Sequence, residues 1–220
     1  MSDHHDHAHD PRNGAHADPH APITEREDLT YYEKRVQAIS ALLIEKGLVT
    51  ADEMRRTIED RDSRTPALGA KIVARAWVDP VFKARLLSDT KAAVAELGVD
   101  TGSLIKIDAV ENTDTLHNVV VCTLCSCYPR AILGLPPDWY KSLNYRSRVV
   151  KDPRSVLKEF GLVLASEVEV RVYDSTADLR YLVIPARPAG TEGMSEEELA
   201  SLVTRDSMIG VTKARNPGEH

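Results

Sequence analysis

The chain has 220 residues, of which 42% are hydrophobic and 28% are charged, a composition typical of a soluble globular protein with one fair-sized domain. Its formal net charge of −6 argues against a nucleic-acid partner, because phosphates require a basic surface. No apolar run approaches the roughly 20 residues of a membrane span, and the N-terminus lacks the apolar core of a signal peptide, so we expect a cytoplasmic protein without a membrane partner.

Residues 1–22 predict a disordered tail, because they are polar and cannot bury a core. Neutral imidazole is a good ligand for transition metals, so the tail either has no role or gathers metal ions loosely. Six of the eight histidines lie here, namely His4, His5, His7, His9, His16 and His20.

Residues 23–65 predict an arm of two helices. Apolar residues recur at helical spacing in the first helix, which is expected to end at Gly47. Thr50 and Glu53 have the spacing of a capping box and predict the start of a second, highly charged helix. Residues 60–66 are polar and typical of a linker. Because these two helices cannot close a core alone, we expect the arm to pack on a partner subunit.

Residues 66–213 predict the compact part of the protein, and residues 214–220 a short C-terminal tail. The first segment of the compact part is helical. The pair Asp79-Pro80 is typical of a helix N-terminus, and a later helix is expected to end at Gly98.

Strand signals follow at 104–110 and 118–122, the second being a continuous β-branched run typical of a buried strand. After short helices, residues 168–175 and 180–185 predict two strands paired with each other around a short loop. A capping box at Ser195 predicts the last helix. This order predicts an α+β fold: an N-terminal helical arm plus a layered α/β/β/α-type metal-binding domain.

The only three cysteines, Cys122, Cys125 and Cys127, fall in the sequence VCTLCSCY at the end of the buried strand. Structural disulfides are rare in a reducing cytosol, so the cluster predicts a metal-binding or catalytic site. Structural zinc usually takes four ligands; here no fourth cysteine exists, and His117 lies one strand earlier. A redox C-x-x-C pair would use two thiols and leave the third idle.

The C-x-x-C-x-C spacing favours a different metal site. Cys125 and Cys127 flank the backbone amides of Ser126 and Cys127. If those amides lose their protons, two nitrogens and two thiolates can lie in one plane around a metal ion, and Cys122 can add a third thiolate from below. This N2S3 set leaves one coordination position open, as a catalytic metal requires. Deprotonated amides suit a trivalent ion such as Co(III) or Fe(III).

The cysteine cluster and several later segments resemble the α subunit of nitrile hydratase, from roughly residue 30 to residue 211. The motif C-T-L-C-S-C is highly specific. The resemblance implies a lyase that adds water to a nitrile to give an amide. It also implies a β subunit as partner, in an αβ heterodimer or an α2β2 assembly, and an activator or metallochaperone protein for cobalt loading. The later segments are LGLPPDWYKS (133–142), YRSRVVKDPR (145–154), RVYDSTADLRY (171–181), RPAGTEG (187–193) and LVTRDSMIGV (202–211).

The resemblance also implies roles for individual residues. The implied metal ligands are the thiolates of Cys122, Cys125 and Cys127 and the backbone nitrogens of Ser126 and Cys127. Cys125 is implied to become a sulfinate and Cys127 a sulfenate. Thr123 resembles the cobalt branch, so one Co(III) per α subunit is expected ahead of Fe(III). The metal would act as a Lewis acid, and either water or the Cys127 sulfenate oxygen would attack the nitrile, with two β-subunit arginines as donors to the oxidised sulfurs.

Asp178 and Arg180 match an acidic position and an arginine that support the ligands in that family, while an exposed ion pair is their alternative role. One position departs from the family, because Arg130 stands where many nitrile hydratases have tryptophan. This arginine resembles the catalytic subunit of thiocyanate hydrolase, which has the same motif and an anionic substrate. We expect Arg130 in the subunit interface and a neutral nitrile as substrate. Thiocyanate hydrolase and a non-enzymic metal-binding or redox module are the alternatives.

Overall fold

The computed structural model describes residues 30–102 and 105–218, and the predicted tail at 1–22 lies outside these ranges. The chain divides into two compact units, one of residues 1–54 and one of residues 55–220. In the described part of the chain, no helix combines the length and the hydrophobicity that crossing a bilayer requires.

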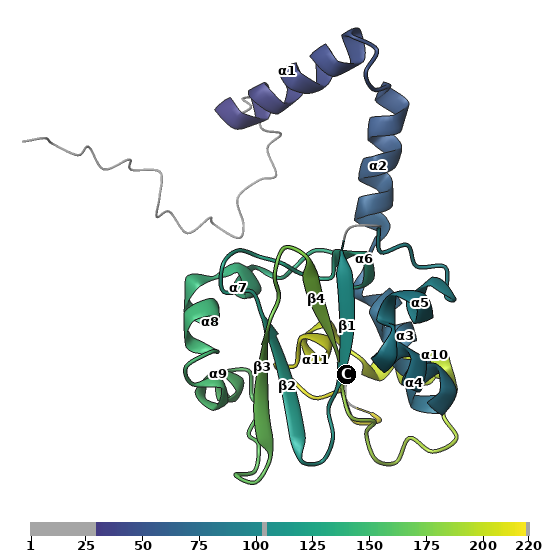
Figure 1. The fold of residues 1–220 in the computed structure, drawn as a ribbon, viewed down its shortest axis with the longest axis vertical. Helices are drawn as coiled ribbons and strands as arrows, with labels where there is room; N and C mark the ends of the chain where they lie inside the picture. The colour runs from purple at the N-terminus through teal and green to yellow at the C-terminus, as the bar shows by residue number, and fades with distance from the viewer. Residues whose placement is uncertain (1–29, 103–104, 219–220) are drawn as a thin grey trace, which may run out of the picture. The chain divides into compact units, whose positions relative to one another are not determined.

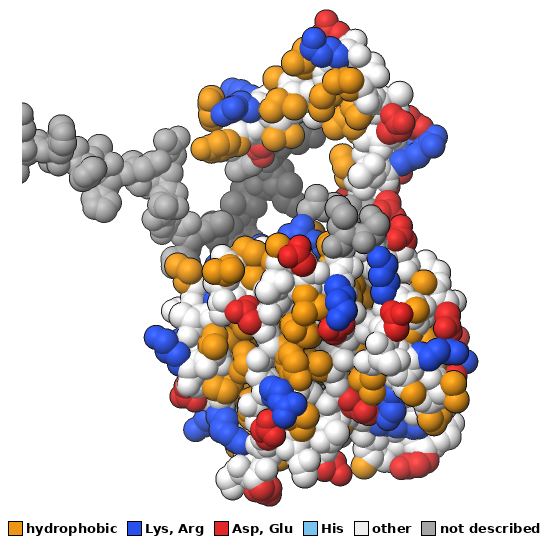
Figure 2. Space-filling model, in the orientation of Figure 1, with side chains coloured by type: hydrophobic (Ala, Val, Ile, Leu, Met, Phe, Trp, Pro, Cys, Tyr) orange, Lys and Arg blue, Asp and Glu red, His pale blue; other side chains and the backbone are white. Residues whose placement is uncertain are grey.

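The first unit contains α1 (Tyr31–Glu45) and the start of α2 (Ala51–Ser63). Gly47 follows the C-cap of α1 with a φ of 65°, so the predicted helix end is confirmed. No residue of α1 is buried, and Figure 2 shows hydrophobic side chains along this helix. The exposed apolar residues of α1 are Tyr31, Tyr32, Val36, Ile39, Leu42 and Ile44.

Helix α2 begins at the predicted capping box. The Thr50 N–H donates to Glu53 Oε2 at 2.7 Å, and the Glu53 N–H donates to Thr50 Oγ1 at 3.1 Å. The helix continues to Ser63, so the linker predicted over 60–66 is helical up to residue 63. An ion pair one helical turn apart, from Arg64 to Asp60 at 2.6 Å, supports this charged end.

The second unit begins with α3 (Pro66–Val78), α4 (Pro80–Ser88) and α5 (Thr90–Ala95). The Asp79 carboxylate caps α4 by accepting hydrogen bonds from the N–H groups of Val81 and Phe82 at 3.0 and 2.9 Å, which confirms the predicted start of this helix. The side chains of Phe82 and Leu86 then enter the core, where their exposed fractions are 2% and 0%.

In the described part of the second unit, four strands form two parallel pairs: β1 (Lys106–Glu111) with β4 (Leu179–Ile184), and β2 (Leu116–Val121) with β3 (Glu169–Asp174). The predicted pairing of the last two strands with each other is therefore wrong. Their connecting turn is short, with the Thr176 N–H donating to Leu179 O at 2.8 Å, but it crosses from one sheet to the other. Instead, β3 pairs with β2, and β4 pairs with β1.

The remaining helices are α6 (Arg130–Leu133), α7 (Asp138–Lys141), α8 (Leu143–Arg148), α9 (Pro153–Glu159), α10 (Glu196–Leu202) and α11 (Arg205–Ile209). Figure 1 shows α7, α8 and α9 on one side of the strands and α3, α4 and α5 on the other. The predicted α+β class is confirmed. β2 lies within the core, since all its residues after Leu116 are buried, and it leads directly into the cysteine loop.

Candidate metal centre

The three cysteines lie on the loop that follows β2. Cys122 and Cys127 are buried, whereas Cys125 is exposed. The Sγ atoms of Cys122 and Cys125 are 3.3 Å apart, those of Cys125 and Cys127 are 3.0 Å apart, and all three lie within 4.8 Å of one another. Three soft donors that converge in this way fit a thiolate-bound metal ion.

The backbone amides between the cysteines also face this cluster. Hydrogen bonds with the Cys127 and Cys122 side chains lower the pKa of Cys125 to about 7, and the amides of Cys127 and Ser126 stabilise the same thiolate. Burial raises the pKa of Cys127 to about 12, while the positive charge of Arg180 acts in the opposite direction. Of these two thiols, Cys125 therefore ionises more readily than Cys127.

Two charged side chains hold the start of the loop. Asp174, at the end of β3, accepts hydrogen bonds from the Thr123 N–H at 2.9 Å and from the Thr123 hydroxyl at 2.6 Å. Arg146, on α8, donates from Nε to Cys122 O at 3.0 Å and from Nη2 to Thr123 O at 2.6 Å. The first peptide units of the loop are therefore bound through both their N–H and their C=O groups.

A buried tyrosine holds the end of the loop. The Tyr140 hydroxyl, on α7, donates to Cys127 O at 2.8 Å. The neighbouring Tyr145 hydroxyl, on α8, donates to Val120 O at 2.7 Å, inside β2. Burial raises the pKa of both phenols well above the ordinary value, so both stay protonated and act as donors.

A cavity of about 340 Å³ opens beside the cysteines. Cys125, Ser126 and Cys127 line one part of it. Its charged lining residues are all basic: Arg64, Arg130 and Arg180. A molecule bound in this cavity would contact the cysteine loop and the guanidinium groups of the arginines. These positive charges favour an anionic molecule or group in the cavity.

The structure places the other three residues named in the sequence analysis, Arg180, Asp178 and Arg130, in different surroundings. Arg180 is half-buried beside the cluster, and its Nε has no hydrogen-bond acceptor within the described residues. Asp178 is exposed in the turn before β4, and its carbonyl accepts from the Lys106 N–H at 2.8 Å. Arg130, expected in the subunit interface, is exposed and lines the cavity.

His117 is a core histidine rather than a neighbour of the thiols. Its Nε2 donates to Gly210 O at 2.7 Å, and its Nδ1 accepts from Asn112 Nδ2 at 3.3 Å. Burial lowers its pKa, so the ring stays neutral. Both ring nitrogens are thus occupied, which argues against the Cys3His zinc alternative.

Three supporting residues were missed by the sequence analysis: Asp174, Arg146 and Tyr140. Each lies inside a segment whose resemblance had been noted, but no spacing rule connects it to the cysteines. For Asp174 a signal existed, since an acidic residue at the end of a strand can reach the end of a parallel neighbour. Using that signal required knowing that β3 pairs with β2.

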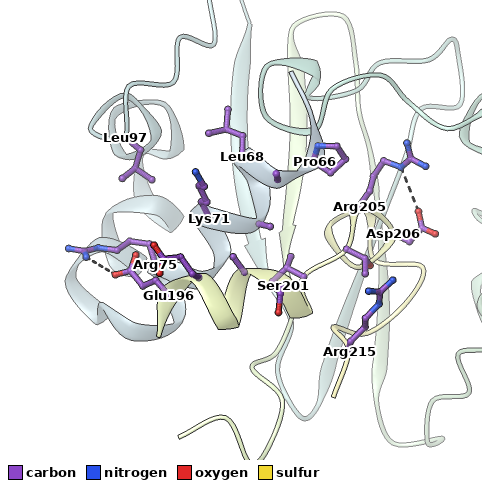
Figure 3. A pocket seen from close by; sticks show the side chains of 16 residues that line it. Pro66, Leu68, Lys71, Arg75, Leu97, Glu196, Ser201, Arg205, Asp206 and Arg215 are labelled. Atoms are coloured by element: carbon purple, nitrogen blue, oxygen red, sulfur yellow. Dashed lines mark hydrogen bonds and ion pairs between the residues drawn. The ribbon is translucent and has the colours of Figure 1, made fainter. Parts of the chain in front are cut away.

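A second, larger cavity of about 1080 Å³ lies between α3, α10 and α11 (Figure 3). Its rim carries charges of both signs, and Arg75 forms an ion pair with Glu196 at 2.8 Å. Among the described residues that line it, there is no cysteine or histidine. The cysteines that could hold a metal ion therefore belong to the smaller cavity, which Cys125 and Cys127 line.

Comparison with known proteins points to one family. A family model described as "Nitrile hydratase, alpha chain" matches residues 30–212. The low-molecular weight cobalt-containing nitrile hydratase subunit alpha of Rhodococcus rhodochrous is 54% identical over 186 residues, which cover 84% of this chain and 90% of that subunit.

Two solved structures share the fold. A recombinant thiocyanate hydrolase with partially modified cobalt centres has a TM-score of 0.81 and 42% identity, covering 86% of this chain and 93% of that chain. A double mutant of the Fe-type nitrile hydratase from Comamonas testosteroni Ni1 has a TM-score of 0.79 and 47% identity, with the same coverage of both chains.

Proposed function

The chain belongs to the nitrile hydratase α-chain family, and from this premise we propose that it is the metal-binding, catalytic subunit of an enzyme that hydrates nitriles to amides. One observation carries the proposal: the three cysteine sulfurs lie within 4.8 Å of one another, and two of these cysteines, Cys125 and Cys127, line a cavity. Within the described residues, the other charged groups at this cavity are arginines, so the cysteines are the groups with which a substrate would react.

The proposed ligands are the thiolates of Cys122, Cys125 and Cys127 and the backbone nitrogens of Ser126 and Cys127. The cobalt-containing relative and Thr123 support cobalt, in the Co(III) state, ahead of iron. When bound, such an ion supplies Lewis-acid activation of a nitrile or a water molecule. The chain supplies the donor set and the rigid loop that presents it.

Arg180 is proposed to support charge on the oxidised third cysteine. We propose that Cys125 carries a sulfinate and Cys127 a sulfenate, both of which are anionic. Arg180 lies beside Cys127 and opposes the effect of burial on its pKa. Its Nε–H has no acceptor among the described groups, so it is free to donate to an oxygen on that sulfur. Asp178 is exposed. It stays a proposed supporting residue, and no contact between its side chain and the cysteine loop is part of the proposal.

A β subunit is proposed to cover the centre, in an αβ or α2β2 assembly, after loading by an activator protein. Leu124, between the first two cysteines, is 86% exposed, and Cys125 is also exposed. An apolar side chain and a reactive sulfur at one loop tip are typical of a surface that a partner covers. In the first unit, the apolar residues of α1 suit a partner as well.

The test is coexpression with a nitrile hydratase β subunit in cobalt medium, followed by elemental analysis and a turnover assay with acrylonitrile. We expect about one cobalt per α chain and formation of acrylamide. Stoichiometric iron or zinc in fully active protein would refute the cobalt assignment. A fully cobalt-loaded complex that does not hydrate acrylonitrile or other small nitriles would refute the proposed reaction.

Thiocyanate hydrolysis is the second candidate, because Arg130 lines the cavity and favours an anionic substrate. The test compares kcat/KM for a small nitrile and for thiocyanate, on the chain as it stands and on Arg130→Trp. A tenfold preference corresponds to only about 1.4 kcal/mol of transition-state binding. We expect the nitrile to win, since identity to the nitrile hydratase subunit is higher. A thiocyanate preference that Arg130→Trp removes would establish the second candidate instead.

A further inference from the structure

We propose that Arg146 is a positioning residue that locks the first cysteine of the cluster against the other two, an inference that rests on the proposed metal-binding function. Arg146 is half-buried and lies 24 residues from Cys122 in the chain. Its Nε and Nη2 donate to two consecutive carbonyl oxygens, those of Cys122 and Thr123, at 3.0 and 2.6 Å. The loop is thus bound at the point where it leaves β2.

The guanidinium group suits this task because its N–H groups form a rigid planar fork. Two bonds from one fork fix the relative orientation of two carbonyl groups, whereas an ammonium is a point charge that fixes neither. Orienting the carbonyls of Cys122 and Thr123 sets the backbone direction, and hence where Cys122 Sγ lies. That sulfur is 3.3 Å from Cys125 Sγ and accepts the Cys125 N–H at 3.3 Å.

The helix that carries Arg146 is itself tied to β2, the strand that leads into the cysteine loop. The Ser142 hydroxyl oxygen caps α8 by accepting from the Tyr145 N–H at 3.2 Å. The Tyr145 hydroxyl then donates to Val120 O at 2.7 Å. The helix that carries the Arg146 clamp therefore rests on β2, while the guanidinium fork binds the loop directly after β2 from this fixed base.

The clamp also places a positive charge beneath a loop that becomes anionic when it holds a metal ion. Three anionic sulfur groups and two deprotonated amides carry more negative charge than a trivalent cation supplies. A half-buried guanidinium offsets part of this excess, because charges interact more strongly away from bulk water. Arg146 therefore contributes both position and charge to the three-sulfur site.

The test uses the cobalt-loaded complex and two variants, Arg146→Met and Arg146→Lys. The measurements are the rate of cobalt release to excess EDTA, followed by elemental analysis, and the sulfur-to-cobalt absorption bands. We expect release to be at least about tenfold faster in Arg146→Met, with shifted bands. Arg146→Lys should recover part of the retention through its charge but not the wild-type spectrum, since it cannot form the fork.

Arg154→Met is the matched control. Arg154 also donates to backbone carbonyls, including Leu164 O at 3.3 Å and Ala165 O at 3.1 Å, but in the loop before β3. Its loss should lower the melting temperature without changing cobalt release or the spectrum. Equal release from wild type and Arg146→Met, or equally fast release from Arg154→Met, would overturn the inference. If the wild-type complex itself holds no cobalt, the proposed function fails, and that result is distinct from both.

Discussion

Replacing Tyr140 with phenylalanine tests whether the buried hydroxyl that binds the cysteine loop stabilises the fold and the proposed metal site. The ring is fully buried and should stay in place, since its contacts with Tyr128 and Tyr145, at centroid distances of 5.2 and 5.8 Å, do not need the hydroxyl. The change removes the bond to Cys127 O at 2.8 Å and leaves that carbonyl without this donor. An unsatisfied buried group costs about 1–3 kcal/mol, which corresponds to a loss of about 2–12 °C in melting temperature for a domain of this size.

The assay is thermal unfolding of the cobalt-loaded protein, together with cobalt release to a chelator. Tyr145→Phe is the matched control, because it removes an equally buried hydroxyl bond, to Val120 O at 2.7 Å within β2. Both variants should lose similar stability, but Tyr140→Phe should speed cobalt release more, because Tyr140 holds a proposed ligand residue directly whereas Tyr145 acts on the loop only through α8. An unchanged melting temperature in Tyr140→Phe would refute the stability argument. Equal cobalt release from both variants would show that the effect is global.

Three further predictions follow from the loop, the tail and the core. Mass spectrometry of the active enzyme should find two added oxygens on Cys125 and one on Cys127; three unmodified thiols in active protein would contradict this. Deleting residues 1–22 should leave the activity of loaded enzyme unchanged and slow cobalt loading only if the tail gathers metal. Gly210→Ala should destabilise the fold by about 3 kcal/mol or more, because the new Cβ would lie 1.9 Å from Asn118 O and the residue has a φ of +90°. Chemical denaturation measures this loss. A denaturation midpoint equal to that of the wild type would show that the backbone shifts to make room for the new atom.

Helix starts could be predicted from the sequence because their signals are local. Thr50 and Ser195 each exchange hydrogen bonds with a glutamate three residues later, as the capping-box spacing requires. Asp79 accepts from amides two and three residues ahead. None of these bonds depends on how distant parts of the chain pack, so the pattern of residue types sufficed.

The cysteine cluster was predictable for the same reason, whereas its supports were not. The three sulfurs converge within a span of six residues, so loop geometry alone brings them together. The residues that hold the loop lie 24 residues away at Arg146, 51 at Asp174 and 13 at Tyr140. Their contacts arise from the packing of α7, α8 and β3 around β2, which no local spacing encodes.

The choice between the two acidic residues near the last strands illustrates how sheet pairing selects a site residue. In a hairpin of β3 and β4, Asp174 and Asp178 would lie at the same turn, and neither would be favoured. In the observed parallel pairing, Val121 is the register partner of Asp174, and the Ser175 N–H donates to Val121 O at 2.7 Å.

The ends of β2 and β3 therefore lie side by side, and the chain leaves β2 directly into the cysteine loop. The Asp174 carboxylate reaches the Thr123 amide and hydroxyl from this position. Residue 178 already belongs to the approach to β4, where its carbonyl binds Lys106 of β1. Carboxyl ends of parallel strands commonly host functional sites, and here the pairing of β2 with β3 decides which carboxylate supports the proposed metal loop.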